Sequence, residues 1–251
     1  MGENIALLYN KFGRKMYVST LDTGIAPHLL LDGFWESWIT SAIQPYIRGS
    51  VFFDIGANFG WYTLLAAHIG AKRVYSFEPN KYVFRLLKDS CAINGFSVVL
   101  ENAAVGEEDK DLLFFYKQHF LGNGSCLENE EDKEIQYPVP CMSLDKYQKY
   151  WDDSDLKEAP VTLKVDVEGF EPRVILGAQK LLSERDCSAF VEYHADPNNE
   201  NSLKSMLDLF ESLGYVMSHL PPGEEGMERL ITREELSGIP NADMLVFKRF
   251  G

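Results

Sequence analysis

The sequence predicts an α/β fold with an open, mostly parallel sheet that is covered by helices on both faces. From residue 50 onward, short apolar segments alternate with longer segments whose apolar residues recur at helical spacing. The first apolar segment, 51–55, also runs directly into a glycine-containing turn, which a helical pattern follows. Strands that alternate with helices build βαβ units with right-handed crossovers, and these units place their strands parallel.

The core elements follow this alternation in order along the chain. Asn94-Gly95 ends the second helical segment, and Pro172 fits the first turn of a later helix, where its missing N–H is harmless. Helices are expected at 59–69, at 82–93, from about 172 onward and at 202–213. Strands are expected at 51–55, 73–77, 97–100, 161–165, 188–193, 215–220 and 244–247.

The middle of the chain interrupts this alternation. Two apolar segments, 112–116 and 135–142, have the composition of strands, and the acidic run 128–134 between them is expected to be a solvated face. We therefore expect a hairpin-like insertion at about 111–142 within a domain that spans 51–251.

Both ends of the chain add segments to this domain. Residues 1–50 precede the first core strand and are expected to form an extension packed on the core. This extension would consist of a small hairpin and a helix that contains Trp35, Glu36 and Trp38. The polar, glycine-containing stretch 221–240 is a candidate lid or second hairpin.

Composition excludes several classes of protein. The 251 residues include 24 basic and 38 acidic side chains, a formal net charge of −14 that repels phosphate backbones, so no nucleic-acid partner is expected. No apolar run approaches the roughly 20 residues of a membrane span, and the opening residues lack the blocks of a secretory signal. The four cysteines show no CxxC spacing. We expect a cytoplasmic protein with reduced thiols and no integral membrane contact.

The strongest functional signal is Asp54-Ile55-Gly56-Ala57-Asn58-Phe59-Gly60, between the first core strand and the first core helix. In an open parallel sheet, ligands bind beyond the carboxyl ends of the strands, where the strand order reverses. Gly56 permits a tight turn, and the amides that begin the following helix can hold a polar or anionic group. The next strand leads to Glu78, and an acid there suits the two ribose hydroxyls of a nucleoside.

Two nucleoside cofactors compete for this motif. A dinucleotide site favours glycine at three positions, which here hold Gly56, Asn58 and Trp61. Asn58 and Trp61 replace the second and third glycines, which lie under the pyrophosphate and at the helix–strand contact, so both replacements count against NAD. Asp54, before the first glycine, can attract the ammonium group of an amino acid. The motif therefore favours S-adenosylmethionine, whose amino-acid end is cationic.

These residues and several further segments resemble the FkbM family of S-adenosylmethionine-dependent methyltransferases. The resemblance covers about residues 33–215, and its most specific segment is Leu163-Lys164-Val165-Asp166-Val167-Glu168-Gly169-Phe170-Glu171. The other segments that carry it are 54–64, Phe77-Glu78-Pro79-Asn80, 102–106, Ser143-Leu144-Asp145, 174–178, Glu192-Tyr193-His194 and Gly33-Phe34-Trp35-Glu36.

The resemblance implies a class I methyltransferase with a Rossmann-like sheet of seven strands, six of them parallel and the last reversed. It also implies O-methylation of a hydroxyl on a sugar, a polysaccharide or a secondary metabolite. Glu78 would bind the ribose with Asn80 nearby, and Asn102 and Ala103 would edge the adenine. The cofactor site would further include Glu36, and at its methionine end Asp54, Gly56, Ala57 and Asn58.

Three titratable residues follow two neighbouring strands beside the place where the methyl group would point. They are Asp166, Glu168 and His194. An alcohol is a poor nucleophile, so the enzyme must align it for in-line displacement and remove its proton. His194 is the natural base near neutral pH, while Asp166 would orient it or bind the amino group of the cofactor. These side chains could also hold a divalent cation, but a metal-free base is the favoured interpretation.

Other functions stay open as alternatives. A nucleotide-dependent oxidoreductase would bind NAD, against which Trp61 argues. A catalytically inactive module with the same fold would bind the cofactor without turnover. A nucleic-acid methyltransferase is opposed by the net charge and by the lack of an Asn-Pro-Pro-aromatic or paired-cysteine motif. The expected partner is a small-molecule or glycan acceptor.

Overall fold

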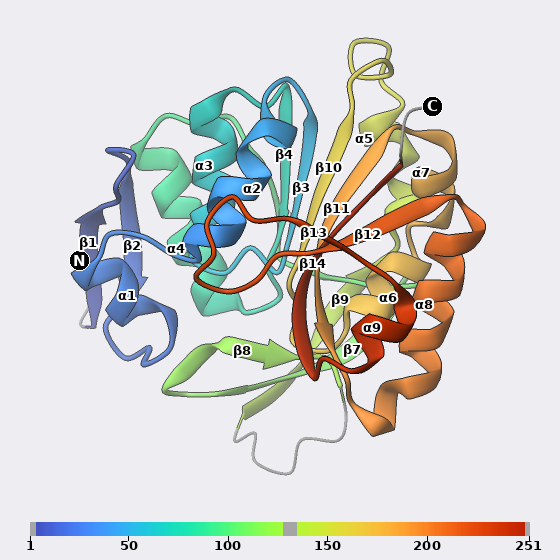
Figure 1. Ribbon diagram of the computed structural model, residues 1–251. Helices are drawn as coiled ribbons and strands as arrows, with labels where there is room; N and C mark the ends of the chain where they lie inside the picture. The colour runs from blue at the N-terminus through green and yellow to red at the C-terminus, as the bar shows by residue number, and fades with distance from the viewer. Residues whose placement is uncertain (1–3, 128–134, 249–251) are drawn as a thin grey trace.

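A central sheet of eight strands organises residues 4–127 and 135–248, which the computed structural model describes (Figure 1). Its strand order is β13-β12-β14-β11-β10-β3-β4-β5. The strands are β3 (Val51–Ile55), β4 (Arg73–Phe77), β5 (Val99–Glu101), β10 (Val161–Val165), β11 (Cys187–His194), β12 (Tyr215–His219), β13 (Arg229–Ile231) and β14 (Asn241–Lys248).

The sheet is mostly parallel, as the sequence predicts. β3 pairs in parallel with β4 on one side and with β10 on the other, while β14 is antiparallel to both of its neighbours, β11 and β12. The expected number of seven strands is wrong for the described residues, because β13 adds an eighth at the edge beyond β12. β12 and β13 form an antiparallel pair, so part of the stretch 221–240 is a second hairpin.

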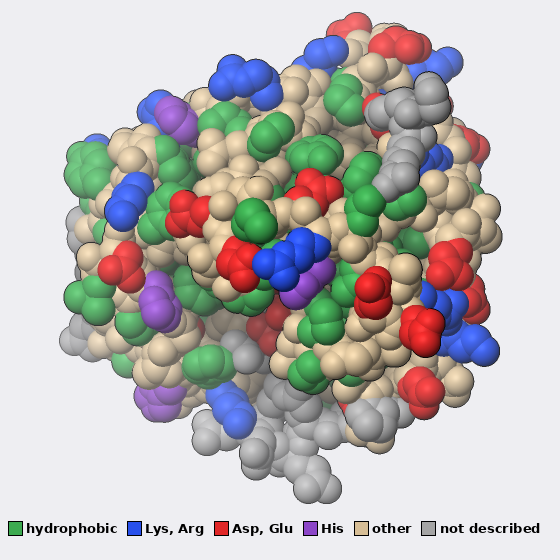
Figure 2. Space-filling view, in the orientation of Figure 1, with side chains coloured by type: hydrophobic (Ala, Val, Ile, Leu, Met, Phe, Trp, Pro, Cys, Tyr) green, Lys and Arg blue, Asp and Glu red, His purple; other side chains and the backbone are tan. Residues whose placement is uncertain are grey.

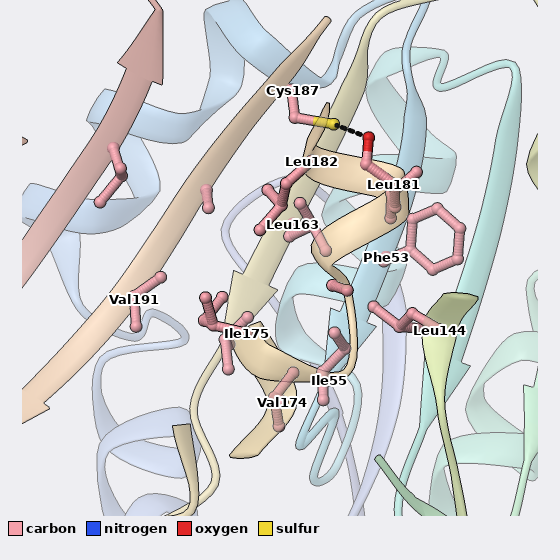
Figure 3. Close-up of a cluster of buried hydrophobic side chains, with 14 of the residues drawn as sticks. Phe53, Ile55, Leu144, Leu163, Val174, Ile175, Leu181, Leu182, Cys187 and Val191 are labelled. Carbon is pink, nitrogen blue, oxygen red and sulfur yellow. Dashed lines mark hydrogen bonds between the residues drawn. The ribbon is translucent and has the colours of Figure 1, made fainter. Parts of the chain in front are cut away.

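Helices cover the two faces of this sheet, because successive strand residues point to opposite sides. Phe52 packs in a hydrophobic cluster with the helices α1–α4, whereas the adjacent Phe53 packs in a cluster with α6–α8 (Figure 3). The α-helices of this core are α2 (Ser37–Ile47), α3 (Trp61–Ile69), α4 (Lys81–Ile93), α5 (Gln148–Trp151), α6 (Glu171–Leu176), α7 (Gln179–Glu184), α8 (Glu200–Ser212) and α9 (Arg233–Ser237). Short 3-10 turns span Leu144–Tyr147 and Pro197–Asn199.

The N-terminal segment is a hairpin followed by two helices rather than one. β1 (Ile5–Tyr9) and β2 (Lys15–Ser19) pair antiparallel, and α1 (Ile25–Leu31) follows them. The prediction that Trp35 and Glu36 lie within a helix is wrong, because α2 begins at Ser37. Glu36 has φ 41°, a left-handed conformation outside the helical region, and its carbonyl accepts the first helical bond from Thr40.

The insertion is a separate four-stranded sheet instead of the expected simple hairpin. Its order is β6-β9-β7-β8, with β6 (Ala104–Val105), β7 (Lys110–Lys117), β8 (Phe120–Ser125) and β9 (Ile135–Met142). The acidic run 128–134 lies outside the described residues. Asp22 ties this sheet to the N-terminal segment, since Oδ2 accepts the Leu121 N–H at 3.0 Å while Oδ1 accepts those of Ile25 and Ala26. Strand β8 therefore lies against α1.

Two surface features bear on partners. No described helix combines the length and the apolar character of a membrane span. On the face that Figure 2 shows, acidic and basic side chains are interspersed, and the described Lys and Arg side chains do not gather into one large patch.

Candidate active site

The candidate site lies where the strand order reverses. β3 and β10 are adjacent, and the chain leaves them for opposite halves of the sheet. Gly56 follows β3 and Asp166 follows β10, with the Asp166 N–H donating to the carbonyl of Ile55 at 3.0 Å. Gly56 has φ 82°, and a Cβ at this position would collide with the Asp166 carbonyl oxygen. Only glycine allows the two loops to approach this closely.

Glu78 joins the end of β4 to the glycine-containing loop. Its carboxylate accepts the backbone N–H of Asn58 at 2.8 Å and that of Asn80 at 2.7 Å, and the residue is 6% exposed. Burial raises the pKa of this carboxyl to about 7, although both amide donors act against the rise. Asn58 has φ 49°, a left-handed conformation that asparagine tolerates better than most residues, which explains why it can replace a glycine here.

Two adjoining pockets lie along this edge, and together we call them the groove. The first is narrow, with a free volume of about 40 Å³, and Glu78, Ala103 and Phe170 are among its walls. The second is larger, about 440 Å³, and reaches Trp35 and Glu36 of the N-terminal segment. Both pockets are lined by Gly56, Asn58, Gly122 and Asp166, so they adjoin one another.

The side chains around the narrow pocket have the chemical character that a nucleoside requires. The Glu78 carboxylate is a charge-assisted acceptor for paired hydroxyl groups, and the side chains of Ile55, Phe77, Val105 and Phe170 offer apolar walls for a base. Strand β8 and Phe114 of the insertion close the pocket from outside. The groove thus has a narrow half with apolar walls, the candidate nucleoside half, and a wider, acidic half.

Most of the predicted site residues line this groove. Gly56, Asn58, Glu78 and Ala103 lie in the nucleoside half or at its junction with the larger pocket. The residues in or bordering the larger pocket are Glu36, Ala57, Asp166 and Glu168. Glu168 has φ 56°, an unfavourable conformation for its type, and its carbonyl accepts the Ser125 hydroxyl at 2.9 Å.

Three predicted cofactor residues have structural contacts instead of lining either pocket. Asp54 is 1% exposed and accepts the Thr63 hydroxyl at 2.5 Å, and burial raises its pKa to about 6. Asn80 caps α4, since its Oδ1 accepts the N–H of Tyr82. Asn102 donates to the carbonyls of Glu78 and Pro79, so it supports the loop that carries the ribose candidate.

His194 does not line the groove but lies next to a residue that does. It is absent from the walls of both pockets, and its Nε2 lies 2.9 Å from Oε1 of Glu192, which does line the larger pocket. The geometry of this contact is not that of a hydrogen bond. The structure therefore brings Asp166 and Glu168 together at the groove and connects His194 to it through Glu192.

Sequence reasoning missed four charged or polar residues around Asp166. Lys164 lies 3.0 Å from Asp166 and is 3% exposed, and Glu192 faces Asp243 directly across β11 and β14. The Tyr62 hydroxyl donates to Glu36 at 2.7 Å. A lysine in the strand Val161–Val165, whose other residues are apolar or threonine, was the signal for this cluster, because an unpaired lysine is almost never fully buried.

Within 4–127 and 135–248, no three His, Cys, Asp or Glu side chains are arranged to hold a metal ion.

Comparisons with known proteins give the family. The family model "Methyltransferase FkbM domain" matches residues 54–217, and no curated protein matches the chain. Among solved structures, an rRNA methylase from Streptococcus thermophilus is 10% identical over 86% of this chain and 98% of its own, with a TM-score of 0.49. A putative rRNA-methylase from Clostridium thermocellum is 10% identical, over 87% and 99%, with a TM-score of 0.48.

TYW2 from M. jannaschii, in complex with AdoMet, is 12% identical over 99% of this chain and 89% of its own, with a TM-score of 0.45. The assignment does not depend on these structures, because the family model alone matches well over half of the chain. By that match, this protein belongs to the FkbM methyltransferase family.

Proposed function

We propose that this methyltransferase transfers a methyl group from S-adenosylmethionine to a hydroxyl of a sugar, a polysaccharide or a secondary metabolite. The observation that carries the proposal is the position of Glu78. Its carboxylate stands at the end of β4, against the loop after β3, in the half of the groove with apolar walls. A nucleoside bound there would present its ribose to Glu78 and direct its remaining half toward Asp166.

The residues present fit the cofactor, which would supply an electrophilic methyl group when bound. Glu78 would accept the ribose hydroxyls, and Ala103 would border the base. Gly56, Ala57, Asn58 and Glu36 would surround the amino-acid end in the larger pocket. Asp54, which is turned into the core, would stabilise the loop rather than touch the cofactor.

The acceptor would occupy the outer part of the larger pocket, beside the N-terminal segment. Its walls there include Trp35 and Phe120, aromatic surfaces of the kind that pack against apolar faces of sugars and metabolites. The carboxyl groups of Glu36, Asp166, Glu168 and Glu192 line the same pocket, and the ionised Asp166 disfavours phosphorylated or nucleic-acid acceptors.

Glu168 is the candidate base that we favour. It lines the larger pocket, and its strained backbone holds it at the turn after β10. Asp166 is already bonded to Lys164, and His194 reaches the groove only through Glu192. In this scheme Glu168 would orient the acceptor hydroxyl and accept its proton, and the bound cofactor would supply the methyl group.

The test is transfer of labelled methyl groups from S-adenosylmethionine to a panel of glycosides, polyols and hydroxylated metabolites, with tRNA and rRNA as competing acceptors. Label in an alkali-stable ether of a hydroxyl compound supports the proposal. Label confined to RNA overturns the acceptor class. Cofactor binding with no transfer to acceptors from extracts would favour the inactive module.

A further inference from the structure

A lysine sits inside the sheet directly behind the wall of the groove. Lys164 is 3% exposed, and its neighbours in β10, Leu163 and Val165, are completely buried. A buried ammonium group is costly unless ionised partners surround it. The lysine therefore belongs to an arrangement of charges rather than to the apolar packing of the strand.

The nearest partner of Lys164 is Asp166, two residues further along the chain and just past the end of β10. The Lys164 Nζ donates to Asp166 Oδ2 at 3.0 Å, and it also lies 5.2 Å from the centre of the Tyr62 ring. The two ends of this ion pair differ in exposure. The Asp166 side chain is 29% exposed whereas that of Lys164 is 3% exposed, so the pair presents only its negative end to the groove.

Carboxylates from several elements face the Lys164 ammonium. Burial alone would lower its pKa, yet Asp166 first and then the other carboxylates raise it, so Lys164 is protonated. Although burial alone would raise the pKa of Asp166, Lys164 holds it below its usual value. The groups that face this ion pair are Glu36 before α2, Asp54 on β3, Tyr62 on α3, Glu192 and His194 on β11 and Asp243 on β14, with His219 of β12 facing Asp243.

The other carboxylates near the groove are less suited to receive a cation. Burial raises the pKa of Glu36, and its carboxylate already accepts the Tyr62 hydroxyl. Burial and the charge of Asp166 raise the pKa of Glu192. Asp54 is bonded to Thr63 inside the core. Asp166 lines both pockets and its pKa is lowered, whereas Glu168, the candidate base, lines only the larger pocket.

We propose that Lys164 is a positioning residue that fixes Asp166 at the wall of the groove as the acceptor for the α-ammonium group of S-adenosylmethionine. The inference rests on the proposed function, which places the amino-acid end of the cofactor in the larger pocket. Lys164 does not touch the cofactor and acts through Asp166. Its removal changes recognition of the amino-acid end while leaving recognition of the adenosine end intact.

The test compares two ligands by calorimetric titration. S-adenosylhomocysteine carries the α-ammonium group, and 5′-methylthioadenosine has the same adenosine and thioether without the amino-acid end. Lys164→Met keeps a long apolar side chain but removes the charge, so it should weaken S-adenosylhomocysteine binding by about ten-fold or more and change methylthioadenosine binding less than about two-fold. Lys164→Arg, which retains the charge, should restore much of the loss.

The matched control is Lys146→Met, because Lys146 also lies 3.0 Å from an aspartate, Asp109, but is exposed outside the groove. It should change neither affinity. Equal losses for both ligands in Lys164→Met, or no loss for either, would overturn the proposal. If Lys164→Met does not fold, Asp166→Asn tests the proposal in its place. Unchanged affinity of Asp166→Asn for S-adenosylhomocysteine would also overturn the proposal. A wild-type protein that binds neither ligand would instead refute the proposed function.

Discussion

The Glu78 carboxylate accepts the backbone N–H of Asn58 at 2.8 Å, which links the ends of two neighbouring parallel strands. This bond orients the acid toward the same pocket that the loop after β3 borders. It also keeps a carboxylate in an almost fully buried position, where two amide donors offset part of the cost of desolvation. The proposed ribose site is therefore preformed.

Replacing Glu78 tests this site. Glu78→Gln should weaken S-adenosylhomocysteine binding by about 1.5–3 kcal/mol, because the ribose hydroxyls lose a charged acceptor. Calorimetric titration measures the effect, and thermal unfolding of the variant controls for damage to the loop. Unchanged affinity in a folded variant would remove Glu78 from the ribose site.

The same carboxyl makes binding depend on pH. Since burial raises the pKa of Glu78 to about 7 in the free protein, and hydroxyl donors favour its ionised form, S-adenosylhomocysteine affinity should rise from pH 6 to pH 7.5. Titrations across this range should show the increase in the wild type and a flatter profile in Glu78→Gln. An affinity that falls over this range in the wild type would contradict the assignment.

Stability should also change with pH. Burial raises the pKa of Asp54 to about 6 and that of Glu171 to about 7, and such carboxyls bind protons more tightly folded than unfolded. Their contribution makes the free energy of unfolding fall as pH rises from about 4.5 to about 7, and then level off. Calorimetric Tm values at constant ionic strength should therefore be higher at pH 5 than at pH 7.5. A higher Tm at pH 7.5 would show that these acids are not buried as described.

Gly56 is the position least able to accept a side chain. Gly56→Ala should destabilise the protein by about 2–4 kcal/mol, because φ is 82° and the new Cβ meets the Asp166 carbonyl. Gly70→Ala is the matched control, with φ 93° and nothing within 4 Å of the new atom, and should cost about 1 kcal/mol. Chemical denaturation gives both values. Equal losses would mean that the two loops do not touch.

Two substitutions separate the candidate bases. Glu168→Gln should lower kcat at least about 100-fold while S-adenosylhomocysteine affinity stays within about two-fold, because proton transfer contributes about 10²–10⁴-fold. His194→Gln should lower kcat less, since His194 reaches the groove only through Glu192. Single-turnover rates with an identified acceptor measure both. The reverse order of effects would make His194 the base.

The carboxylates of the larger pocket already have a cation beside them, the ammonium group of Lys164. We therefore expect chelation with EDTA to change the methyl-transfer rate by less than about two-fold. Loss of activity on chelation that added magnesium restores would show that a metal ion assists the reaction.

The features that the sequence predicts well are local ones. The strand at 51–55, the turn at Gly56 and the acid at the end of the next strand all lie within one βαβ unit, so their spacing indicates their geometry. Features that depend on distant contacts were missed. The buried charge of Lys164 is stabilised in part by Glu192 and Asp243. These two residues become cross-strand neighbours only when β14 pairs with β11.

The predictions for the N-terminal segment and for the insertion were partly wrong for the same reason. A helix was expected to include Glu36. In the structure Glu36 has a left-handed backbone conformation, and its carboxylate accepts a hydrogen bond from Tyr62 on another helix. The predicted hairpin-like insertion also lacked strand β8, where Gly124 packs so closely on the Phe114 ring that a Cβ would collide with it. Neither tertiary contact is visible in the local pattern.

A crystal structure of the protein with S-adenosylhomocysteine tests the central claim most directly. The account predicts the ribose hydroxyls within hydrogen-bond distance of Glu78 and the amino-acid end beside Asp166, with the sulfur facing the larger pocket. A ligand that binds elsewhere, or one that lies in the groove with its ribose away from Glu78, would contradict it.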